Sequence, residues 1–198
     1  MKCSEAVSQL RDVLRGDEMI VSSNGHISRV AYHFLPRPQL YLRGSMGLPM
    51  AVGLGLALAH QHKTIIVLTG DGNFLMGLGS VTTISYLSPP NLKIIILDNE
   101  AYATTGGQET VSTAIDYPSM IQGMGITAVK STDPHEAKDK LNKLLEQTIC
   151  EPGPKILHIK IGKEMIPLDY IPWHPVRICL NFKKQHNINS KTEEKNDV

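Results

Sequence analysis

"TIIVLTGDGNFLMGLGSVTTISYLSPPNLKIIILDNEAY", residues 64–102, is the stretch of sequence that decides the fold. Its runs at 64–69 and 92–97 are short and largely apolar, which is typical of strands buried on both faces. Residues 75–86, between the two runs, are expected to form a helix. A strand, a helix and a second strand in this order indicate neighbouring parallel strands in an α/β protein.

The rest of the chain continues this alternation of helices and apolar strands. Helices are expected at 4–15, 27–35, 48–60, 118–124 and 134–149, strands at 18–23, 126–129 and 155–161, and a brief strand that runs into a glycine turn at 40–47. The order predicts a three-layer α/β/α architecture with a mainly parallel sheet. No internal repeat or low-complexity linker interrupts residues 1–175, which are expected to form one domain. The polar end, 176–198, is expected to be a solvated tail.

Composition narrows the class of protein further. The 198 residues are 41% hydrophobic and 20% charged, as in an ordinary soluble domain, and the net charge of +1 provides no basic field for nucleic acid. The longest apolar run, 46–59, is too short to span a bilayer. The three cysteines are far apart and form no C-x-x-C pair, which disfavours zinc, iron–sulfur and disulfide frameworks. A cytoplasmic protein with no nucleic-acid or membrane partner is expected.

Each apolar run within residues 64–102 ends in a small cluster of acidic or amide residues. Asp71 stands between Gly70 and Gly72, directly after a predicted strand, where a helix is expected to begin. A carboxylate there either caps the helix or holds a hard cation that binds phosphate oxygens. Asn99 ends the next strand, and the tips of adjacent parallel strands lie at one edge of the sheet. The pair therefore favours a cation site built from carboxylate, amide and backbone oxygens.

Gly70-Asp71-Gly72, followed by about two dozen residues and Asn99, resembles the thiamine diphosphate motif of decarboxylases, acetolactate synthases and their relatives. The resemblance implies thiamine diphosphate and Mg²⁺ as cofactors and a thiamine diphosphate-binding fold. It also implies that the Mg²⁺ ligands are Asp71, Asn99 and the main-chain oxygen of Ala101.

The preceding segment "RGSMGLPMAVGLGLALA", residues 43–59, is also similar to this family. The likeness implies that the Gly44 carbonyl contacts the aminopyrimidine of the cofactor and that Met46 is the wedge that bends it. Ser45 lies between them in the same cofactor-binding segment. Gly44 and Met46 would thus have the catalytic role of positioning the cofactor. Outside this context Met46 would be read as a core methionine.

Two further segments are similar to the family. "SSNGHIS", residues 22–28, resembles the loop that touches the diphosphate, which implies that Ser23, Gly25 and His26 bind the cofactor, together with Asn73 after the glycine motif. His26 could equally be a surface histidine.

"AYATTGGQET", residues 101–110, resembles the active-site loop of sulfopyruvate and phosphonopyruvate decarboxylases. That likeness implies that Tyr102 contacts the cofactor and that Thr105 and Gln108 contact the substrate. Arg29 is a further candidate for an anionic substrate group. The alternative reading of this segment is a polar turn around its two glycines.

The resemblance also implies a partner. In the family, the glutamate that activates the cofactor lies on a pyrimidine-binding domain, and this chain is too short to contain one as well. The chain is therefore expected to be the β, diphosphate-binding subunit of a hetero-oligomer whose α subunit binds the pyrimidine. The expected reaction converts a 2-oxo acid to CO₂ and an aldehyde.

Three alternative readings of the function remain, and the sequence departs from the family pattern at one place. "DNEAYATTG" is also similar to the β subunits of 2-oxoacid:ferredoxin oxidoreductases, although the cysteines offer no cluster site. A nucleotide-binding Rossmann loop would need a third glycine where Leu75 stands. A non-catalytic subunit of the same fold is disfavoured because Asp71, Asn99 and Met46 are intact. Asp98 and Glu100 add two acids beside the expected diphosphate, which would repel it unless they are paired or point away.

Overall fold

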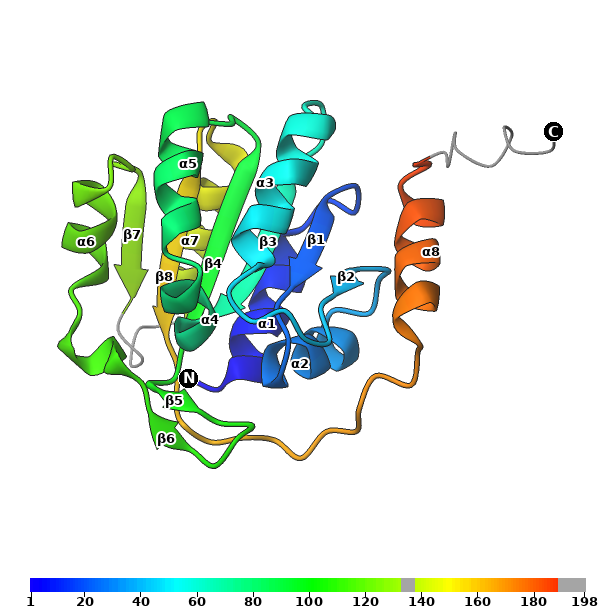
Figure 1. The fold of residues 1–198 in the computed structure, drawn as a ribbon, viewed down its shortest axis with the longest axis horizontal. Coiled ribbons are helices and arrows are strands. Elements are labelled where there is room, and N and C mark those ends of the chain that lie inside the picture. The colour runs from blue at the N-terminus through cyan, green and yellow to red at the C-terminus, as the bar shows by residue number, and fades with distance from the viewer. Residues whose placement is uncertain (133–137, 189–198) are drawn as a thin grey trace, which may run out of the picture.

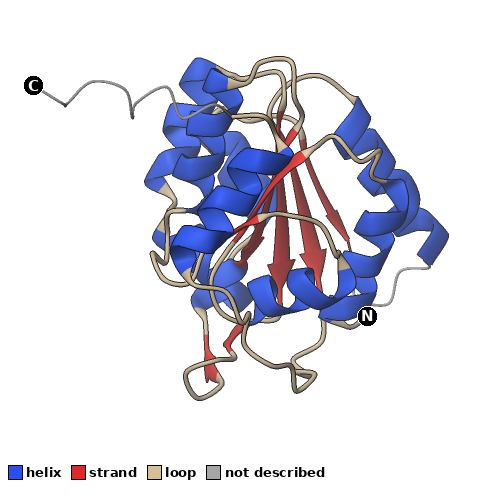
Figure 2. Cartoon of the chain, turned by 90° about the vertical axis from the view of Figure 1, so that its right-hand side faces the viewer, coloured by secondary structure: helices blue, strands red, loops and turns tan. Residues whose placement is uncertain are grey.

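The computed structural model describes residues 1–132 and 138–188. Its main feature is a six-stranded sheet in the order β2-β1-β3-β4-β8-β7, in which every pairing is parallel. Helices cover both faces of this sheet (Figures 1 and 2). The expected three-layer α/β/α architecture with a mainly parallel sheet is confirmed.

The strands of the sheet are β1 (Met19–Ser22), β2 (Leu40–Tyr41), β3 (Ile65–Gly70), β4 (Leu92–Asp98), β7 (Val129–Thr132) and β8 (Lys155–Lys160). The helices are α1 (Cys3–Val13), α2 (His26–Phe34), α3 (Pro49–Ala59), α4 (Asp71–Met76), α5 (Gly79–Leu87), α6 (Tyr117–Gly123), α7 (Lys138–Cys150) and α8 (Pro175–Gln185). A small antiparallel hairpin, β5 (Ala101–Tyr102) and β6 (Gln108–Glu109), and a 3-10 helix, Val111–Ala114, follow β4. Within the described ranges, no helix has the length and apolar character needed to cross a membrane.

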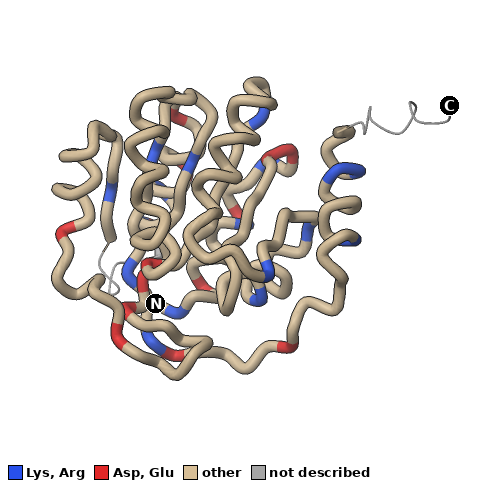
Figure 3. Tube along the Cα trace, viewed as in Figure 1, with Lys and Arg blue, Asp and Glu red and all other residues tan. Residues whose placement is uncertain are grey.

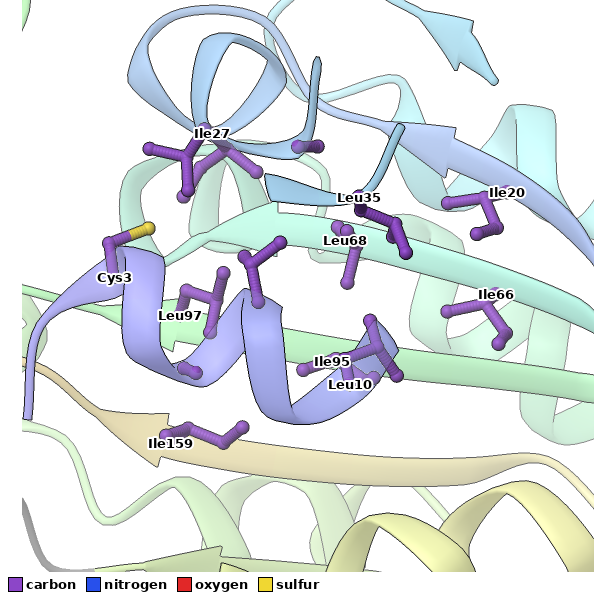
Figure 4. Packing of buried hydrophobic residues seen from close by; sticks show 14 of the residues in the cluster. Cys3, Leu10, Ile20, Ile27, Leu35, Ile66, Leu68, Ile95, Leu97 and Ile159 are labelled. Carbon is purple, nitrogen blue, oxygen red and sulfur yellow. The ribbon is translucent and has the colours of Figure 1, made fainter. Parts of the chain in front are cut away.

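The core consists of two apolar layers separated by the sheet. Helices α1, α2 and α7 pack on one face, and α3, α4, α5 and α6 pack on the other. Because successive strand residues point to opposite faces, Ile66 of β3 enters the first layer and Val67 the second. Figure 4 shows Leu10 of α1 beside Ile95 of β4, and Leu97 of the same strand nearer to Cys3 at the start of α1. Burial on both faces explains why the central strands are largely apolar.

The helix predicted at 75–86 is wrong in its boundaries, because the structure has two helices there, α4 and α5. The first begins at Asp71, immediately after β3, and the break follows at Gly77. A Cβ atom on Gly77 would overlap the Gly47 carbonyl oxygen. The backbone of this turn therefore packs directly against the loop before α3, a tertiary contact that helical periodicity does not reveal.

The brief strand predicted from residue 40 is confirmed as the two-residue β2. The strand predicted at 126–129 begins only at Val129, where pairing with β8 starts. Ile126 is buried, but in the loop before that strand. The predicted start of a helix at residue 134 lies outside the described residues, and α7 is described from Lys138.

The expected polar tail is not observed at its beginning, since residues Pro175–Gln185 form α8 beside β2 (Figure 1). Its N-cap is His174, whose Nδ1 accepts a hydrogen bond from the Val176 N–H at 3.3 Å. Ile178 and Phe182, one helical turn apart, are buried against the core. The apolar pair anchors an otherwise basic and polar helix.

Candidate functional site

A cavity of about 170 Å³ opens at the carboxyl edge of the sheet. Its walls come from the segments that follow β1, β3, β4 and β8, so that four strand tips converge on it. In open parallel sheets, this edge is where ligands bind. The β5–β6 hairpin and the segment that leads from β8 to α8 lie at the same edge (Figure 1).

Most of the predicted site residues line this single cavity. They are Gly25, His26, Met46, Gly70, Asp71, Gly72, Asn73, Asn99, Ala101, Tyr102 and Thr105. Residues from four separate stretches of the sequence are thus brought together. Ser23, Gly44, Ser45, Gln108 and Arg29 do not line it.

The residues outside the cavity have identifiable surroundings. Ser23 is buried at the end of β1, where its N–H donates to the Leu68 carbonyl at 2.8 Å. Its hydroxyl has no partner among the described residues. Gly44 and Ser45 are exposed on the loop that leads to Met46, and Ser45 has a φ of 61°. These two residues therefore stand beside the cavity, next to a residue that lines it.

Gln108 belongs to the β5–β6 hairpin and closes its turn. Its Nε2 donates to the Thr105 carbonyl at 3.2 Å, so the amide is engaged within the hairpin. Arg29, on α2, lines a neighbouring pocket together with Arg43. Neither Gln108 nor Arg29 reaches the main cavity.

Asp71 is the buried acid of the site, with 2% of its surface exposed. The Thr110 hydroxyl donates to its Oδ2 at 2.5 Å. Burial raises the pKa of Asp71, the hydrogen bond from Thr110 opposes that effect, and the nearby charge of Asp98 adds to it. Among the described residues, no Lys, Arg or His forms an ion pair with this carboxylate. A buried carboxylate without a cation is costly, so the position suits a bound metal ion.

Asn99 and Ala101 lie at the neighbouring strand tip. Pairing of β3 with β4 sets Gly70 opposite Leu97, so the residues that follow each strand lie side by side. The Asn99 Oδ1 accepts a hydrogen bond from the Ala101 N–H at 3.3 Å, and Glu100 between them has a φ of 59°. This tight turn brings both residues to the cavity.

A carboxylate, an amide oxygen and a backbone carbonyl are hard oxygen ligands of the kind Mg²⁺ prefers. In residues 1–132 and 138–188, no three His, Cys, Asp or Glu side chains cluster as a metal site. The set of Asp71, Asn99 and Ala101 contains only one such residue. Donor chemistry and burial therefore fit a divalent cation, which these residues would hold together with phosphate and water.

The two additional acids are paired within the protein. Asp98 accepts hydrogen bonds from His158 Nε2 at 2.8 Å, Ser112 Oγ at 2.6 Å and Lys160 Nζ at 3.0 Å. Burial alone would raise the pKa of Asp98, but these hydrogen bonds outweigh it and hold the pKa well below its usual range. Lys160 also pairs with Glu100. These partners therefore compensate the negative charges of Asp98 and Glu100, whereas Asp71 has no basic partner among the described residues.

Asn73 braces the cavity from the start of α4. Its Oδ1 accepts from the Gly47 N–H at 3.0 Å, and its Nδ2 donates to Asn24 Oδ1 at 3.0 Å. One side chain thus ties the loop after β1 to the loop before α3. The side-chain amide of Asn73 is engaged in these hydrogen bonds, so its backbone N–H is the group available to a ligand.

Glycines occur where two walls of the cavity approach most closely. A Cβ atom on Gly72 would lie 2.5 Å from Cε1 of Tyr102, and one on Gly25 would lie 3.4 Å from the Thr104 hydroxyl. Gly25 also has a φ of 83°, which favours glycine. These positions leave backbone N–H groups open at the starts of α2 and α4.

His26 opens α2 at the cavity wall. Burial, and then the charge of Arg29, lower its pKa, so the imidazole is held neutral. Its Nε2 is buried without a partner in the described part of the chain. A ligand in the cavity would supply that partner.

Several functional contacts were missed by sequence reasoning. Asn24 lines the cavity and stands inside the quoted loop, so its segment was identified but not the residue. Thr110 reaches Asp71 only because the hairpin folds back, a contact without a local signal. Cys3 also lines the cavity, but burial raises the pKa of its thiol to about 12, so it is no nucleophile.

A parallel α/β sheet with converging strand tips, glycine-lined walls and a buried carboxylate without a basic partner in the described residues has the features of a site that would suit a phosphate-bearing ligand held through a divalent metal. Residues 22–159 match the family described as thiamine pyrophosphate enzyme, C-terminal TPP binding domain. The chain belongs to this family, and the resemblance drawn from its motifs is confirmed.

Individual relatives agree with this assignment. Sulfopyruvate decarboxylase subunit beta of Methanothermobacter thermautotrophicus is 38% identical over 167 residues, which are 83% of this chain and 85% of the relative. Phosphonopyruvate decarboxylase of Streptomyces viridochromogenes is 37% identical over 79% of this chain, but the match spans only 38% of that relative. The solved structure of benzoylformate decarboxylase from Polynucleobacter necessarius superimposes with a TM-score of 0.67 at 16% identity, covering 82% of this chain and 33% of that one. The last likeness concerns the fold alone.

Proposed function

We propose that this chain is the diphosphate-binding subunit of a thiamine diphosphate- and Mg²⁺-dependent decarboxylase. Its substrate is a 2-oxo acid of the sulfopyruvate or phosphonopyruvate kind, and its products are CO₂ and an aldehyde. The family assignment supports the cofactor, and the names of the similar decarboxylases support the reaction class. The single observation that carries the proposal is Asp71, a buried carboxylate beside Asn99 with no basic partner in the described residues.

In this proposal the role of the chain is to bind and orient the cofactor. Asp71, Asn99 and the Ala101 carbonyl hold Mg²⁺, and Mg²⁺ anchors the diphosphate. The open N–H groups near Gly25 and Gly72 contact the phosphate oxygens. Bound thiamine diphosphate supplies the electron sink that makes loss of CO₂ possible. His26, whose pKa is lowered mainly by burial, would offer its unpartnered Nε2 to the same ligand, and Met46 would form part of the wall beside the cofactor.

A second subunit completes the site in this proposal. The cavity of about 170 Å³ is smaller than the roughly 300–1,000 Å³ of pockets that enclose a whole cofactor-sized ligand. The part of the cofactor beyond its diphosphate would therefore need cover from another chain. The match to only 38% of the phosphonopyruvate decarboxylase of Streptomyces viridochromogenes supports the same view, because the rest of that relative has room for a further domain. Exposed Leu48 and Met76, both next to Gly47 in the loop that follows Met46, are candidates for the contact.

Calorimetric titration with thiamine diphosphate, with and without Mg²⁺, tests the proposal. The chain is titrated alone and as the complex isolated from its native source. We expect Mg²⁺-dependent binding that Asp71→Ala and Asn99→Ala abolish. Asp98→Ala should mainly lower stability, and Asp12→Ala, which removes an exposed acid of α1, should change neither. Equal loss of binding in the Asp71 and Asp98 variants would show that the ligands are misassigned.

An activity measurement tests the reaction class separately. Native mass spectrometry of the isolated complex should detect a second subunit, and that complex should release an aldehyde from sulfopyruvate or phosphonopyruvate without an electron acceptor. Strict dependence on ferredoxin and coenzyme A would instead support the oxidoreductase alternative.

A further inference from the structure

A second pocket, of about 260 Å³, adjoins the cofactor cavity. Asn24, Gly25 and Thr104 line both, so the two spaces share one wall. The second pocket is rich in hydrogen-bonding side chains, which come from four stretches of the chain: Asn24, Ser28, Arg29, Arg43, Thr104 and Tyr170. Nothing in the binding of a diphosphate at Asp71 requires this pocket.

We call this second pocket the arginine pocket, because Arg29 and Arg43 line it and its described walls contain no Asp or Glu. The charged side chains of its walls are therefore all positive. In the described chain, neither guanidinium forms an ion pair, whereas Arg11 and Arg37 each pair with an acid. Elsewhere, basic and acidic positions are interspersed (Figure 3). Two unpaired guanidinium groups that face one pocket favour an anionic occupant.

Both arginines are held in place by a single segment, residues 170–173, after β8. The Arg29 guanidinium lies 3.8 Å from the centroid of the Tyr170 ring, a cation–π contact that holds its plane. Arg43 Nη1 donates to the carbonyls of Ile171 at 3.4 Å and Trp173 at 2.8 Å. A guanidinium has five N–H donors, so these contacts fix Arg43 and leave most of its donors free.

We propose that the arginine pocket binds the terminal tetrahedral anion, a sulfonate or phosphonate, of the 2-oxo acid substrate. The inference rests on the proposed function, because it names the substrate group that the same site would select. Planar guanidinium forks match the paired oxygens of such a group better than a lysine would. The 2-oxo carboxylate end would pass along the shared wall of Asn24, Gly25 and Thr104 into the cofactor cavity.

The electrostatics of the shared wall agree with this placement. The charge of Arg29 contributes to the lowered pKa of His26, which lines the cofactor cavity. Arg29 is therefore close enough to the cavity to act on one of its walls while its own guanidinium lines the next pocket. A substrate that carries a second anionic group could contact both spaces at once.

Binding of non-reactive dianions tests the inference directly. Phosphonoacetate and sulfoacetate are titrated calorimetrically into the chain, alone and after saturation with thiamine diphosphate and Mg²⁺, with acetate and inorganic phosphate as comparisons. We expect the two dianions to bind more tightly than either comparison. Arg29→Gln and Arg43→Gln should each weaken that binding about tenfold or more, because each removes a charge-assisted hydrogen bond.

Arg177→Gln is the matched control. It removes an equal charge from exposed Arg177, which lies over Trp173 outside the pocket, and should leave the affinity unchanged. Arg43→Lys keeps the charge without the planar fork and should bind several-fold more weakly than wild type. Thermal unfolding shows whether each variant is folded. If Arg43→Gln does not fold, the affinity of Arg43→Lys takes its place in the test.

Unchanged affinity in Arg29→Gln and Arg43→Gln would overturn the inference. So would equal weakening in Arg177→Gln, or inorganic phosphate binding as tightly as phosphonoacetate, which would indicate a general anion site. Failure of thiamine diphosphate itself to bind would overturn the proposed function instead. In that case the titrations of the chain without cofactor still decide whether the arginines select a tetrahedral dianion.

Discussion

Replacing Asp71 by asparagine should stabilise the empty protein and abolish its response to cofactor. The carboxylate is 2% exposed, has no basic partner in the described residues and has its pKa raised by burial. Asparagine keeps an oxygen for the Thr110 hydroxyl but carries no charge. Relief of a buried group without its partner corresponds to about 1–3 kcal/mol. For a domain of this size, that is a rise in Tm of about 2–12 °C.

The assay is thermal unfolding of wild type and Asp71→Asn in EDTA and in Mg²⁺ with thiamine diphosphate. A ligand at about a hundred times its Kd stabilises wild type by about 2.7 kcal/mol, whereas the variant should gain almost nothing. The order of stability should therefore reverse when cofactor is added. If the variant is less stable than wild type in EDTA, or gains as much from cofactor, the assignment of Asp71 as a metal-binding carboxylate is wrong.

The pH dependence in EDTA gives an independent check on the same residue. Because the folded-state pKa of Asp71 is raised above the ordinary value of 3.8, the charged form is disfavoured in the folded protein. The penalty is present at neutral pH and is relieved as the pH falls through the raised pKa. The stability difference between wild type and Asp71→Asn should thus shrink with acid. A difference that is constant down to pH 4 would contradict this reading.

Three further outcomes are expected. Asp98→Ala should lower the free energy of unfolding by about 3 kcal/mol, because it leaves His158 buried without its acid, and denaturant titration should show this with cofactor binding retained well below the new Tm. Gly72→Ala would place a Cβ 2.5 Å from the Tyr102 ring and should weaken cofactor affinity several-fold while changing stability by less than about 1 kcal/mol, which calorimetry and thermal unfolding can separate. His26 has a pKa below its ordinary 6.5, so wild type should lose stability as the pH falls below about 6.5, and His26→Gln should lose less over that range.

The central strands and the tips that carry the acids were predictable from sequence. Largely apolar runs such as 92–97 are typical of strands buried on both faces, and parallel pairing then brings Asp71 and Asn99 to one edge. The spacing between glycine motif and asparagine added the family resemblance. These signals are local, or depend only on how neighbouring parallel strands align.

The features that sequence reasoning missed depend on contacts between distant segments. The break between α4 and α5 arises where Gly77 packs on Gly47, and the pairing of Asp98 with His158 joins two strands. The contact of Arg29 with Tyr170 spans most of the chain. The sequence did contain a signal for α8, since Pro175 begins the helix and its apolar residues recur after one turn. The polar composition of this segment nevertheless led to the prediction of a solvated tail.

Anomalous diffraction from crystals grown with thiamine diphosphate and Mn²⁺, a substitute for Mg²⁺ with a measurable signal, tests the metal site most directly. We predict one manganese peak in contact with the Asp71 carboxylate, the Asn99 amide oxygen and the Ala101 carbonyl, with diphosphate oxygens completing its coordination. A diphosphate seated in the cavity with its metal bound elsewhere, or with none at these three oxygens, would contradict the account.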